Sequence, residues 1–377
     1  MLAFINLYCT QPLLPLLSRV FRASEGEVSW TISASTLGVA ISAALLAVFA
    51  ERVDRKRTIV LSMLVLAVCT LLTATATSLV VLAAWRLLQG LVTPGIFIIT
   101  IAYVTEEWPA RLVPRVMSFY VAGTVFGGFL GRISGGMIAE RWGWRSPFVV
   151  LGVVGLIGAL TVMRLLPAAR HSSPAHEHAA PWTPFVRNFR NRRLVATFGI
   201  GFCMLFTLVS VFSYITFHLA AAPFFLTTEQ LSWLFSVYLF GLVATLMAGT
   251  VLARVGLRVG MLAAIGLAFC GVAMTLAPSL WAVGMGLALT GAGVFIAQTC
   301  ANSFLRDAAP AGTRVSAAGM YISSYYIGGT VGGILPGVVW RYGGWPGCAA
   351  VTCGFLGCGA VLAFFGWRVR VGDPIRL

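Results

Sequence analysis

The chain has 377 residues, of which 59% are hydrophobic and 10% are charged, and its mean hydropathy is +0.92. Soluble domains carry about a quarter charged residues, so this composition excludes an ordinary water-soluble enzyme and indicates a protein surrounded by lipid. The net charge of +15 would suit a nucleic-acid-binding protein, but the basic residues lie in short connections between apolar runs, and we expect no nucleic-acid partner.

Apolar runs of about 20 residues, long enough to cross a bilayer as helices, recur along nearly the whole chain. They predict an all-α membrane protein with twelve transmembrane helices at residues 2–18, 29–50, 58–77, 79–103, 115–138, 146–165, 195–219, 231–253, 258–277, 280–303, 315–340 and 346–367. The first run is interrupted by Pro12 and lacks a small-residue cleavage site, so it is not expected to be a signal peptide. A start of translation further upstream would explain why this run is short.

One long polar connection, residues 166–194, divides the runs into two sets of six. Its prolines, serines and charges predict a cytoplasmic linker between two pseudo-symmetric six-helix bundles, at residues 1–165 and 195–377. Within the linker, residues 185–193 would form a short amphipathic helix on anionic headgroups. The linker histidines have no rigid frame or cysteine partners, so neither a metal site nor a cofactor is expected.

The shorter connections alternate between strongly basic and nearly uncharged. Most arginines and Lys56, the only lysine, fall in the first kind. The positive-inside rule places these basic connections in the cytoplasm, together with both termini of the chain.

A short polar segment between two apolar runs, residues 47–57, has a counterpart about 200 residues later, at residues 249–258. Each copy is preceded by a similar entry sequence, at residues 27–30 and 229–233. Duplicated sets of membrane spans joined by short loops are typical of secondary transporters. The repeat therefore favours a carrier over an enzyme.

Glycines recur at every fourth position in the fifth and eleventh apolar runs. Such spacing lines one face of a helix and lets a neighbouring backbone approach closely, either for static packing or for sliding. The two series are Gly123, Gly127, Gly131 and Gly135, and Gly329, Gly333 and Gly337.

With these residues in view, the chain resembles the major facilitator superfamily over nearly its full length. Residues 47–57 are similar to that family's loop between spans 2 and 3, usually written Gly-x-x-x-Asp-Arg-x-Gly-Arg-Lys/Arg, and the resemblance implies a charge latch that holds one conformation. The latch positions are Ala47, Glu51, Arg52, Asp54, Arg55 and Lys56 in the first copy and Gly249, Arg254 and Gly256 in the second. Here Ala47, Glu51 and Asp54 replace the family's Gly, Asp and second Gly.

Two further segments extend the resemblance. Residues 85–90 contain an Arg-x-x-Gln-Gly pattern like that of the family's fourth span, and the glycines of the fifth run look like a motif of exporters. The nearest likeness is to a bacterial branch linked to acriflavine sensitivity and to efflux of drugs or sugars. It implies a monomeric, proton-coupled antiporter in the bacterial inner membrane.

Polar residues inside the apolar runs are costly unless they face water or a partner, so we expect them near a central cavity that binds a small organic molecule. Arg86 would bias coupling or attract an anionic group there, and the alternative for both Arg86 and Arg132 is that the side chain reaches the outer surface. Hydrogen bonding between helices is the alternative role for the neutral residues. The cavity candidates are Asn6, Tyr8, Gln11, Arg86, Gln89, Arg132, Gln298, Asn302, Tyr325 and Tyr326.

No Asp or Glu lies deep within a predicted span. Proton coupling usually needs a buried titratable group, which leaves His218, Glu27 and Glu229 as candidates. Capping of a helix N-terminus is the alternative for the two glutamates, and packing is the alternative for the histidine.

The sequence thus predicts a secondary active transporter that exports a small organic compound by alternating access. An importer of sugars or small organic acids would use the same fold in the opposite direction, and a non-transporting protein with this fold is a further alternative. A membrane enzyme is disfavoured because the sequence contains no recognisable nucleophile, metal-protease or nucleotide-binding motif.

Overall fold

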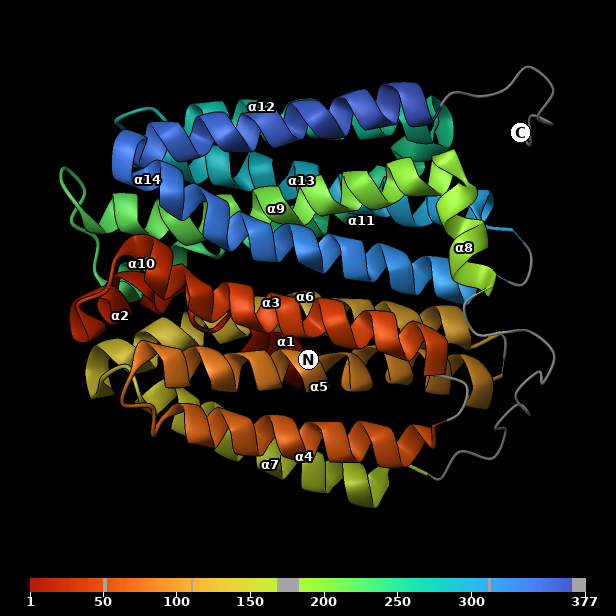
Figure 1. Cartoon of the computed structure of the whole chain (residues 1–377), viewed down its shortest axis with the longest axis horizontal. Coiled ribbons are helices and arrows are strands. Elements are labelled where there is room, and N and C mark those ends of the chain that lie inside the picture. The colour runs from red at the N-terminus through yellow and green to blue at the C-terminus, as the bar shows by residue number, and fades with distance from the viewer. Residues whose placement is uncertain (50–52, 110, 168–182, 311–312, 368–377) are drawn as a thin grey trace.

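Figure 1 shows the computed structural model of the chain, which describes all residues except 50–52, 110, 168–182, 311–312 and 368–377. The described residues form helices and contain no strand. Nine of their helices are long and apolar enough to cross a membrane. One of these, α14 (Arg314–Gly366), doubles back at Gly344, whose φ of 53° and ψ of −145° interrupt the helix, so it forms two antiparallel arms.

The first bundle contains the first six predicted spans. Its elements are α1 (Leu2–Tyr8), η1 (Gln11–Leu13), α2 (Leu14–Phe21), α3 (Glu25–Phe49), α4 (Arg55–Thr73), α5 (Leu79–Glu107), α6 (Val113–Trp142) and α7 (Ser146–Leu165). The predicted span at 2–18 is broken into α1, η1 and α2, because Pro12 has no N–H to donate to the carbonyl of Tyr8.

The second bundle contains the other six spans. Its elements are α9 (Arg192–Ala220), α10 (Thr228–Leu234), α11 (Val237–Val255), α12 (Leu257–Met274), α13 (Leu280–Ala308) and the two arms of α14. The predicted span at 231–253 is divided into α10 and α11, and α10 begins with a capping box between Thr227 and Gln230. The prediction of an all-α protein with two six-helix bundles is confirmed.

Part of the predicted linker forms α8 (Thr183–Arg190), which lies across one end of the molecule (Figure 1). We call this the linker end and the opposite end, where α14 turns at Gly344, the hairpin end. Val186 and Phe189 of α8 are exposed, whereas Asn188 is buried and donates a 2.8 Å hydrogen bond to Ser316 Oγ at the start of α14. The linker histidines lie outside the described residues.

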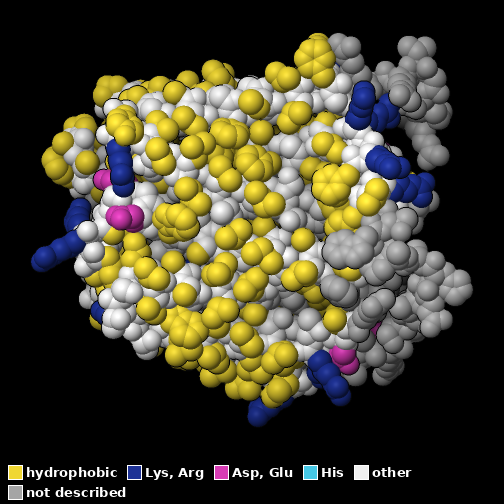
Figure 2. Space-filling view, viewed as in Figure 1, with side chains coloured by type: hydrophobic (Ala, Val, Ile, Leu, Met, Phe, Trp, Pro, Cys, Tyr) yellow, Lys and Arg dark blue, Asp and Glu magenta, His cyan; other side chains and the backbone are white. Residues whose placement is uncertain are grey.

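Hydrophobic side chains cover the middle of the surface in Figure 2, while Lys, Arg, Asp and Glu gather near the two ends. Exposure of large apolar side chains such as Leu61, Ile157 and Phe240 would be unfavourable in water but is favourable in contact with lipid. The chain is therefore a multi-pass membrane protein whose helix axes run from the linker end to the hairpin end.

The two bundles meet mainly along two pairs of helices. Between α3 and α14, Ser33 Oγ donates to the carbonyl of Thr330 at 3.0 Å, and Ser323 Oγ donates to the carbonyl of Ala40 at 2.9 Å. Between α6 and α10, the backbone N–H of Thr228 donates to Glu140 Oε2 at 3.2 Å. The second pair lies at the hairpin end and holds the bundles together there.

The glycines of α6 lie where the broken first span crosses it. A Cβ added at Gly131 or Gly135 would overlap the backbone of Ile5 or Cys9, and one at Gly127 would overlap the backbone of Met1. Glycine is thus required for this approach. Gly123 differs, because an added Cβ there meets no atom within 4 Å.

On α14, the register differs from the predicted series. The backbone of α9 is approached by Gly328 and Gly332, one residue before Gly329 and Gly333. Gly329 instead contacts the side chain of Leu205, whereas Gly333 and Gly337 face Ser33 and Gly26 of α3. Because α14 lies between α9 and α3, it carries glycines on two faces, one toward each helix. A single four-residue period in the sequence does not distinguish the glycines of one face from those of the other.

Candidate functional site

A cavity of about 430 Å³ lies between the two bundles and is lined equally by both. The first bundle supplies residues from α1, α5 and α6, and the second supplies residues from α9, α11, α13 and α14. Its volume falls in the range of small-molecule sites, about 300–1,000 Å³. Most of the lining is aromatic or aliphatic, which suits a largely apolar solute.

The cavity is closed toward the hairpin end. Tyr8, Arg132 and Tyr238 line this end and are nearly inaccessible to solvent. Val121, which lies 11 residues before Arg132 on α6 and hence about 16 Å nearer the linker end, is 49% exposed. Asn302, toward the linker end of α13, is also exposed, so the cavity opens in that direction.

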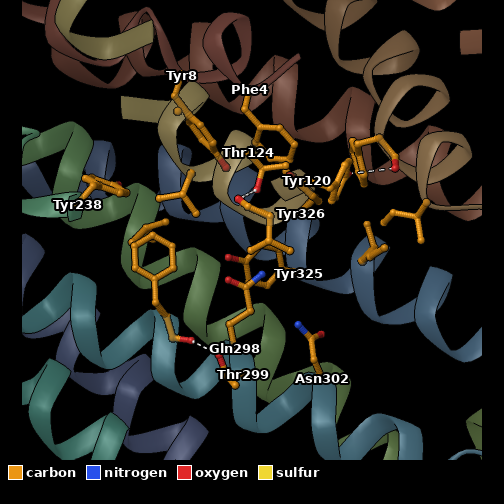
Figure 3. Close-up of a pocket in the computed structure, with 18 of the residues that line it drawn as sticks. Phe4, Tyr8, Tyr120, Thr124, Tyr238, Gln298, Thr299, Asn302, Tyr325 and Tyr326 are labelled. Atoms are coloured by element: carbon orange, nitrogen blue, oxygen red, sulfur yellow. Dashed lines mark hydrogen bonds between the residues drawn. The ribbon is translucent and has the colours of Figure 1, made fainter. Parts of the chain in front are cut away.

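Six of the ten cavity candidates from the sequence line this cavity. Figure 3 shows Tyr8, Gln298, Asn302, Tyr325 and Tyr326 around it, and Arg132 is the sixth. The sequence reasoning missed most of the aromatic wall, including Phe4, Phe97, Tyr120, Tyr238 and Tyr321. A helical signal for part of it was present, because steps of four residues back from Arg132 reach Gly128, Thr124 and Tyr120, which all line the cavity.

Arg86 differs from its predicted place, since it lies outside the lining and is fully buried between α1, α3 and α5. Its guanidinium donates to the carbonyls of Asn6 (2.7 Å) and Leu7 at the end of α1 and to that of Thr31 (3.2 Å) in α3. It also donates to Gln89 Oε1 (2.7 Å) and Ser35 Oγ (3.2 Å). All five of its N–H groups are thus satisfied, and the cation caps the carbonyl end of α1.

Asn6 and Gln89 also lie outside the lining, in hydrogen bonds that join helices. Gln89 Nε2 donates to Thr73 Oγ1 at 2.9 Å, and Thr70 Oγ1 donates to Asn6 Oδ1 at 2.9 Å. These contacts tie α1, α4 and α5 together, which is the alternative role that the sequence left open for them.

Gln11 is outside the lining as well, but it contacts the cavity's cation. Its Oε1 accepts a 2.7 Å hydrogen bond from Arg132 Nε, and its Nε2 donates to Ser213 Oγ of α9 at 3.3 Å. One amide therefore connects the first bundle to the second at the closed end of the cavity.

Arg132 has a mixed polar and aromatic environment. Besides the bond to Gln11, it donates to the carbonyl of Gly128 at 2.8 Å and to the Tyr238 hydroxyl at 3.3 Å. Its Cζ lies 4.4 Å from the ring centre of Tyr8, 4.3 Å from that of Tyr238 and 5.4 Å from that of Phe235, distances at which rings attract a cation.

The predicted latch residues of the first copy are partly described. Glu51 and Arg52 lie outside the described residues. Asp54 caps α4 by accepting from the N–H of Arg57 at 2.8 Å, and Arg55 forms a two-pronged ion pair with Glu106 of α5, at 2.8 Å and 3.0 Å. Lys56 is half-buried in the first turn of α4.

The remaining latch residues lie at the same end. Ala47 of α3 faces Gly319 of α14, so two small residues allow the bundles to meet there. Gly249 lies within α11, Arg254 is exposed near its end, and Gly256, with a φ of 82°, separates α11 from α12.

The three proton-coupling candidates lie outside the cavity lining. Glu27 Oε2 accepts hydrogen bonds from the N–H and Oγ of Ser24 at 2.8 Å and 2.7 Å, which makes it a cap of α3. Glu229 lies in the first turn of α10, and His218 stacks on Trp345 with ring centres 6.2 Å apart. Each thus has the structural surroundings that the sequence gave as the alternative.

Known proteins resemble this chain in both sequence and fold. The Major Facilitator Superfamily profile matches residues 1–227. The chain is 32% identical over 350 residues to the inner membrane transport protein YnfM of Escherichia coli (strain K12), covering 92% of this chain and 83% of that protein. It is 28% identical over 356 residues to an uncharacterized transporter of Buchnera aphidicola subsp. Schizaphis graminum, covering 92% and 84%.

The fold has solved counterparts. A bacterial homolog of the human lysosomal transporter Spinster, in an inward-facing and unoccupied conformation, superposes with a TM-score of 0.78, covering 97% of this chain and 94% of that chain at 17% identity. The helical bundles, the cavity between them and these likenesses lead to one conclusion: the chain belongs to the Major Facilitator Superfamily.

Proposed function

We propose that this protein is a secondary active transporter that exports a small organic compound by alternating access, driven by the proton gradient. The observation that carries the proposal is the cavity between the bundles, which is closed at one end and open at the other. A solute held there contacts both bundles, so tilting one bundle against the other would move the opening from one side to the other.

The contacts at the closed end support this movement. At the hairpin end, α6 and α10 are joined by the hydrogen bond from Thr228 to Glu140 and by the packing of Gly136 against Ser232. The contacts between α6 and α10 are polar or between small groups, and on the other side Gly26 of α3 packs against Gly337 of α14. Contacts of this kind separate at a lower cost in free energy than the apolar packing inside each bundle.

The orientation follows from the basic connections. Arg55, Arg254 and Arg314 all lie at the linker end, which the positive-inside rule assigns to the cytoplasm. The cavity then faces the cytoplasm, which is the side from which an exporter takes up its solute. The glycine face of α6, which resembles a motif of exporters, also favours efflux over import.

Proton coupling is supported by the resemblance to the antiporter branch rather than by a group in the cavity. Among the described residues of the lining, none is acidic or a histidine. Coupling therefore has to be measured directly, in a system where the pH gradient is imposed.

The test combines a screen with reconstitution. Cells that overexpress the protein and cells that lack it are compared for susceptibility to drugs and metabolites, and each solute found is then followed in proteoliposomes. A solute that has no gradient of its own and moves in the direction opposite to protons flowing down an imposed gradient supports proton-coupled export. Accumulation in energised cells points to import instead, and no movement of any solute under any gradient contradicts a transport function.

A further inference from the structure

We propose that the transported solute is an amphipathic organic anion whose carboxylate binds Arg132 at the closed end of the cavity. This inference rests on the proposed transport function and adds the chemical class of the solute. It is carried by a buried cation without an acidic partner, by the rings around it and by an unpaired hydroxyl further along the same cavity.

The charge of Arg132 has no acidic counterpart in the described part of the chain. The ion pairs found there include Arg55 with Glu106 and Arg57 with Asp54, both at the linker end, and none involves Arg132. Arg132 is only 2% exposed, yet its partners are neutral: an amide oxygen, a carbonyl and a hydroxyl. A buried cation is costly unless a counter-charge reaches it, and a solute in the cavity is in a position to supply one.

The guanidinium of Arg132 also has donors left for a ligand. Of its five N–H groups, three donate to Gln11, Gly128 and Tyr238, so one on each terminal nitrogen has no acceptor among the described residues. A carboxylate accepts two such bonds from an arginine more readily than a neutral group does. Arg86 offers a contrast within the same bundle, because all five of its N–H groups are already satisfied.

The rings around Arg132 restrict what else binds there. Tyr8 and Tyr238 lie on the guanidinium within 4.4 Å, and the walls toward the open end include Phe4, Phe97 and Tyr120. An organic anion with an apolar or aromatic body would bury that body against these rings while its carboxylate faces the cation. A strongly hydrated inorganic anion would lose its water without gaining such contacts.

A second polar feature lies on the wall formed by α14. The hydroxyl of Tyr321, a residue of the cavity lining that is 3% exposed, has no hydrogen-bond partner among the described residues. Buried hydroxyl groups are rarely left without a partner, so this one points to a polar group on a bound ligand. The amides of Gln298 and Asn302 on α13 add further donors and acceptors to the same cavity.

The test measures binding to the purified full chain in detergent, so it does not require transport. The probes are benzoate, 4-hydroxybenzoate and octanoate, each compared with its uncharged amide. We expect the carboxylates to raise the unfolding temperature and the amides to have little effect. Carboxylates that stabilise the protein no better than their amides would overturn the proposal.

Substitutions then locate the site. We expect Arg132→Gln to weaken binding of the carboxylates about tenfold or more, since a charge-assisted pair is lost, and Arg132→Lys to weaken it less. Arg145→Gln is the matched control, because that arginine also lies over a ring, 4.4 Å from the centre of Trp144, but does not line the cavity. Equal loss in the Arg145 and Arg132 variants, or no loss in either, counts against the site.

Tyr321→Phe is a second variant, which tests the same cavity if the arginine variants fail to fold. Its hydroxyl has no partner to lose, so we expect the unfolding temperature without ligand to stay the same. Binding of 4-hydroxybenzoate should weaken more than binding of benzoate.

If carboxylates bind through Arg132 but no solute moves in proteoliposomes, the transport function fails and the anion site stands. If neutral solutes are transported and Arg132→Gln transports them normally, the anion site fails and transport stands.

Discussion

Arg86 and Arg132 are both buried in the first bundle, yet their guanidinium groups have opposite surroundings. Arg86 lies among carbonyl, amide and hydroxyl oxygens that satisfy it fully, and it lines no cavity. Arg132 lies beside the cavity, with rings on its faces and part of its donor capacity unused. The first is built into the fold, whereas the second is the group that we propose to bind the solute.

If Arg86 acted in the cavity, as the sequence predicts, Arg86→Ala would abolish transport and leave insertion intact. The structure leads to a different expectation for Arg86→Met. Several buried oxygens at the end of α1 lose their donor, and the protein should be destabilised by about 3 kcal/mol or more.

The measurement is the unfolding temperature of the purified protein in detergent, with Arg145→Met as the control because it removes an exposed arginine that also donates to backbone carbonyls, but outside this network. A wild-type unfolding temperature combined with lost transport would return Arg86 to a direct functional role. The sequence concealed the distinction because three of the acceptors of Arg86 are backbone carbonyls, which leave no pattern of side chains to recognise.

At the scale of helices, the contact between α1 and α6 depends on the absence of side chains. A Cβ at Gly131 would lie 2.7 Å from the Cα of Ile5, whereas a Cβ at Gly123, two turns away on the same helix, would meet nothing. We expect Gly131→Val to destabilise the protein by about 3 kcal/mol, because the first span cannot move away without losing the contacts of Arg86.

Gly123→Val is the matched control and should leave stability unchanged. Yield of monodisperse protein and unfolding temperature measure both variants. Equal behaviour of the two variants would show that the close approach of α1 to α6 is not needed for folding.

The helices themselves were largely predictable from the sequence, because runs of apolar residues report directly on what lipid requires. The breaks were harder to predict. Pro12 indicated one, but the eighth span is divided at Phe235 and Ser236, where the backbone N–H groups bond three residues back and neither proline nor glycine marks the position. The cavity was predictable only in part. Its polar residues stand out in an apolar span, but rings such as Phe97 and Tyr120 look like any other packing residue until the neighbouring helices are placed.

For the whole molecule, alternating access requires the hairpin end to open. A Cβ at Gly136 would lie 2.8 Å from that of Ser232, so α6 and α10 need to move apart by only about 1 Å for Gly136→Cys and Ser232→Cys to form a disulfide across the bundles. We expect oxidation of this pair to stop transport of labelled benzoate in proteoliposomes, and a reductant to restore it.

The control pair joins two helices of one bundle. A Cβ at Gly155 would lie 3.3 Å from that of Ala67, so Gly155→Cys with Ala67→Cys should cross-link α7 to α4 without affecting a rigid-body movement. Both pairs belong in a background where the exposed Cys270 and Cys358 are serine. Undiminished transport by the oxidised pair between the bundles would exclude opening at the hairpin end.

The orientation in the membrane is tested by labelling of single cysteines. The Arg57 side chain is 89% exposed at the linker end, and Trp142 is 68% exposed at the hairpin end. We expect an impermeant maleimide to label Trp142→Cys in intact spheroplasts and Arg57→Cys only in inverted vesicles. Trp144, two residues after Trp142, is unsuitable as a labelling position because its side chain is buried against Phe21 and Phe148. Labelling of both cysteines from one side would contradict the fold in the membrane.

The two hydrogen bonds of Gln11 couple the opening of the hairpin end to the contacts of Arg132. Its amide is bonded on one side to Arg132 and on the other to Ser213 of the opposite bundle. A side chain of fixed length cannot follow both partners once they move apart, so separation at the hairpin end must break one bond or the other. Opening of the hairpin end and rearrangement of the groups around Arg132 are therefore linked mechanically through this glutamine, beside the direct bond from Arg132 to Tyr238.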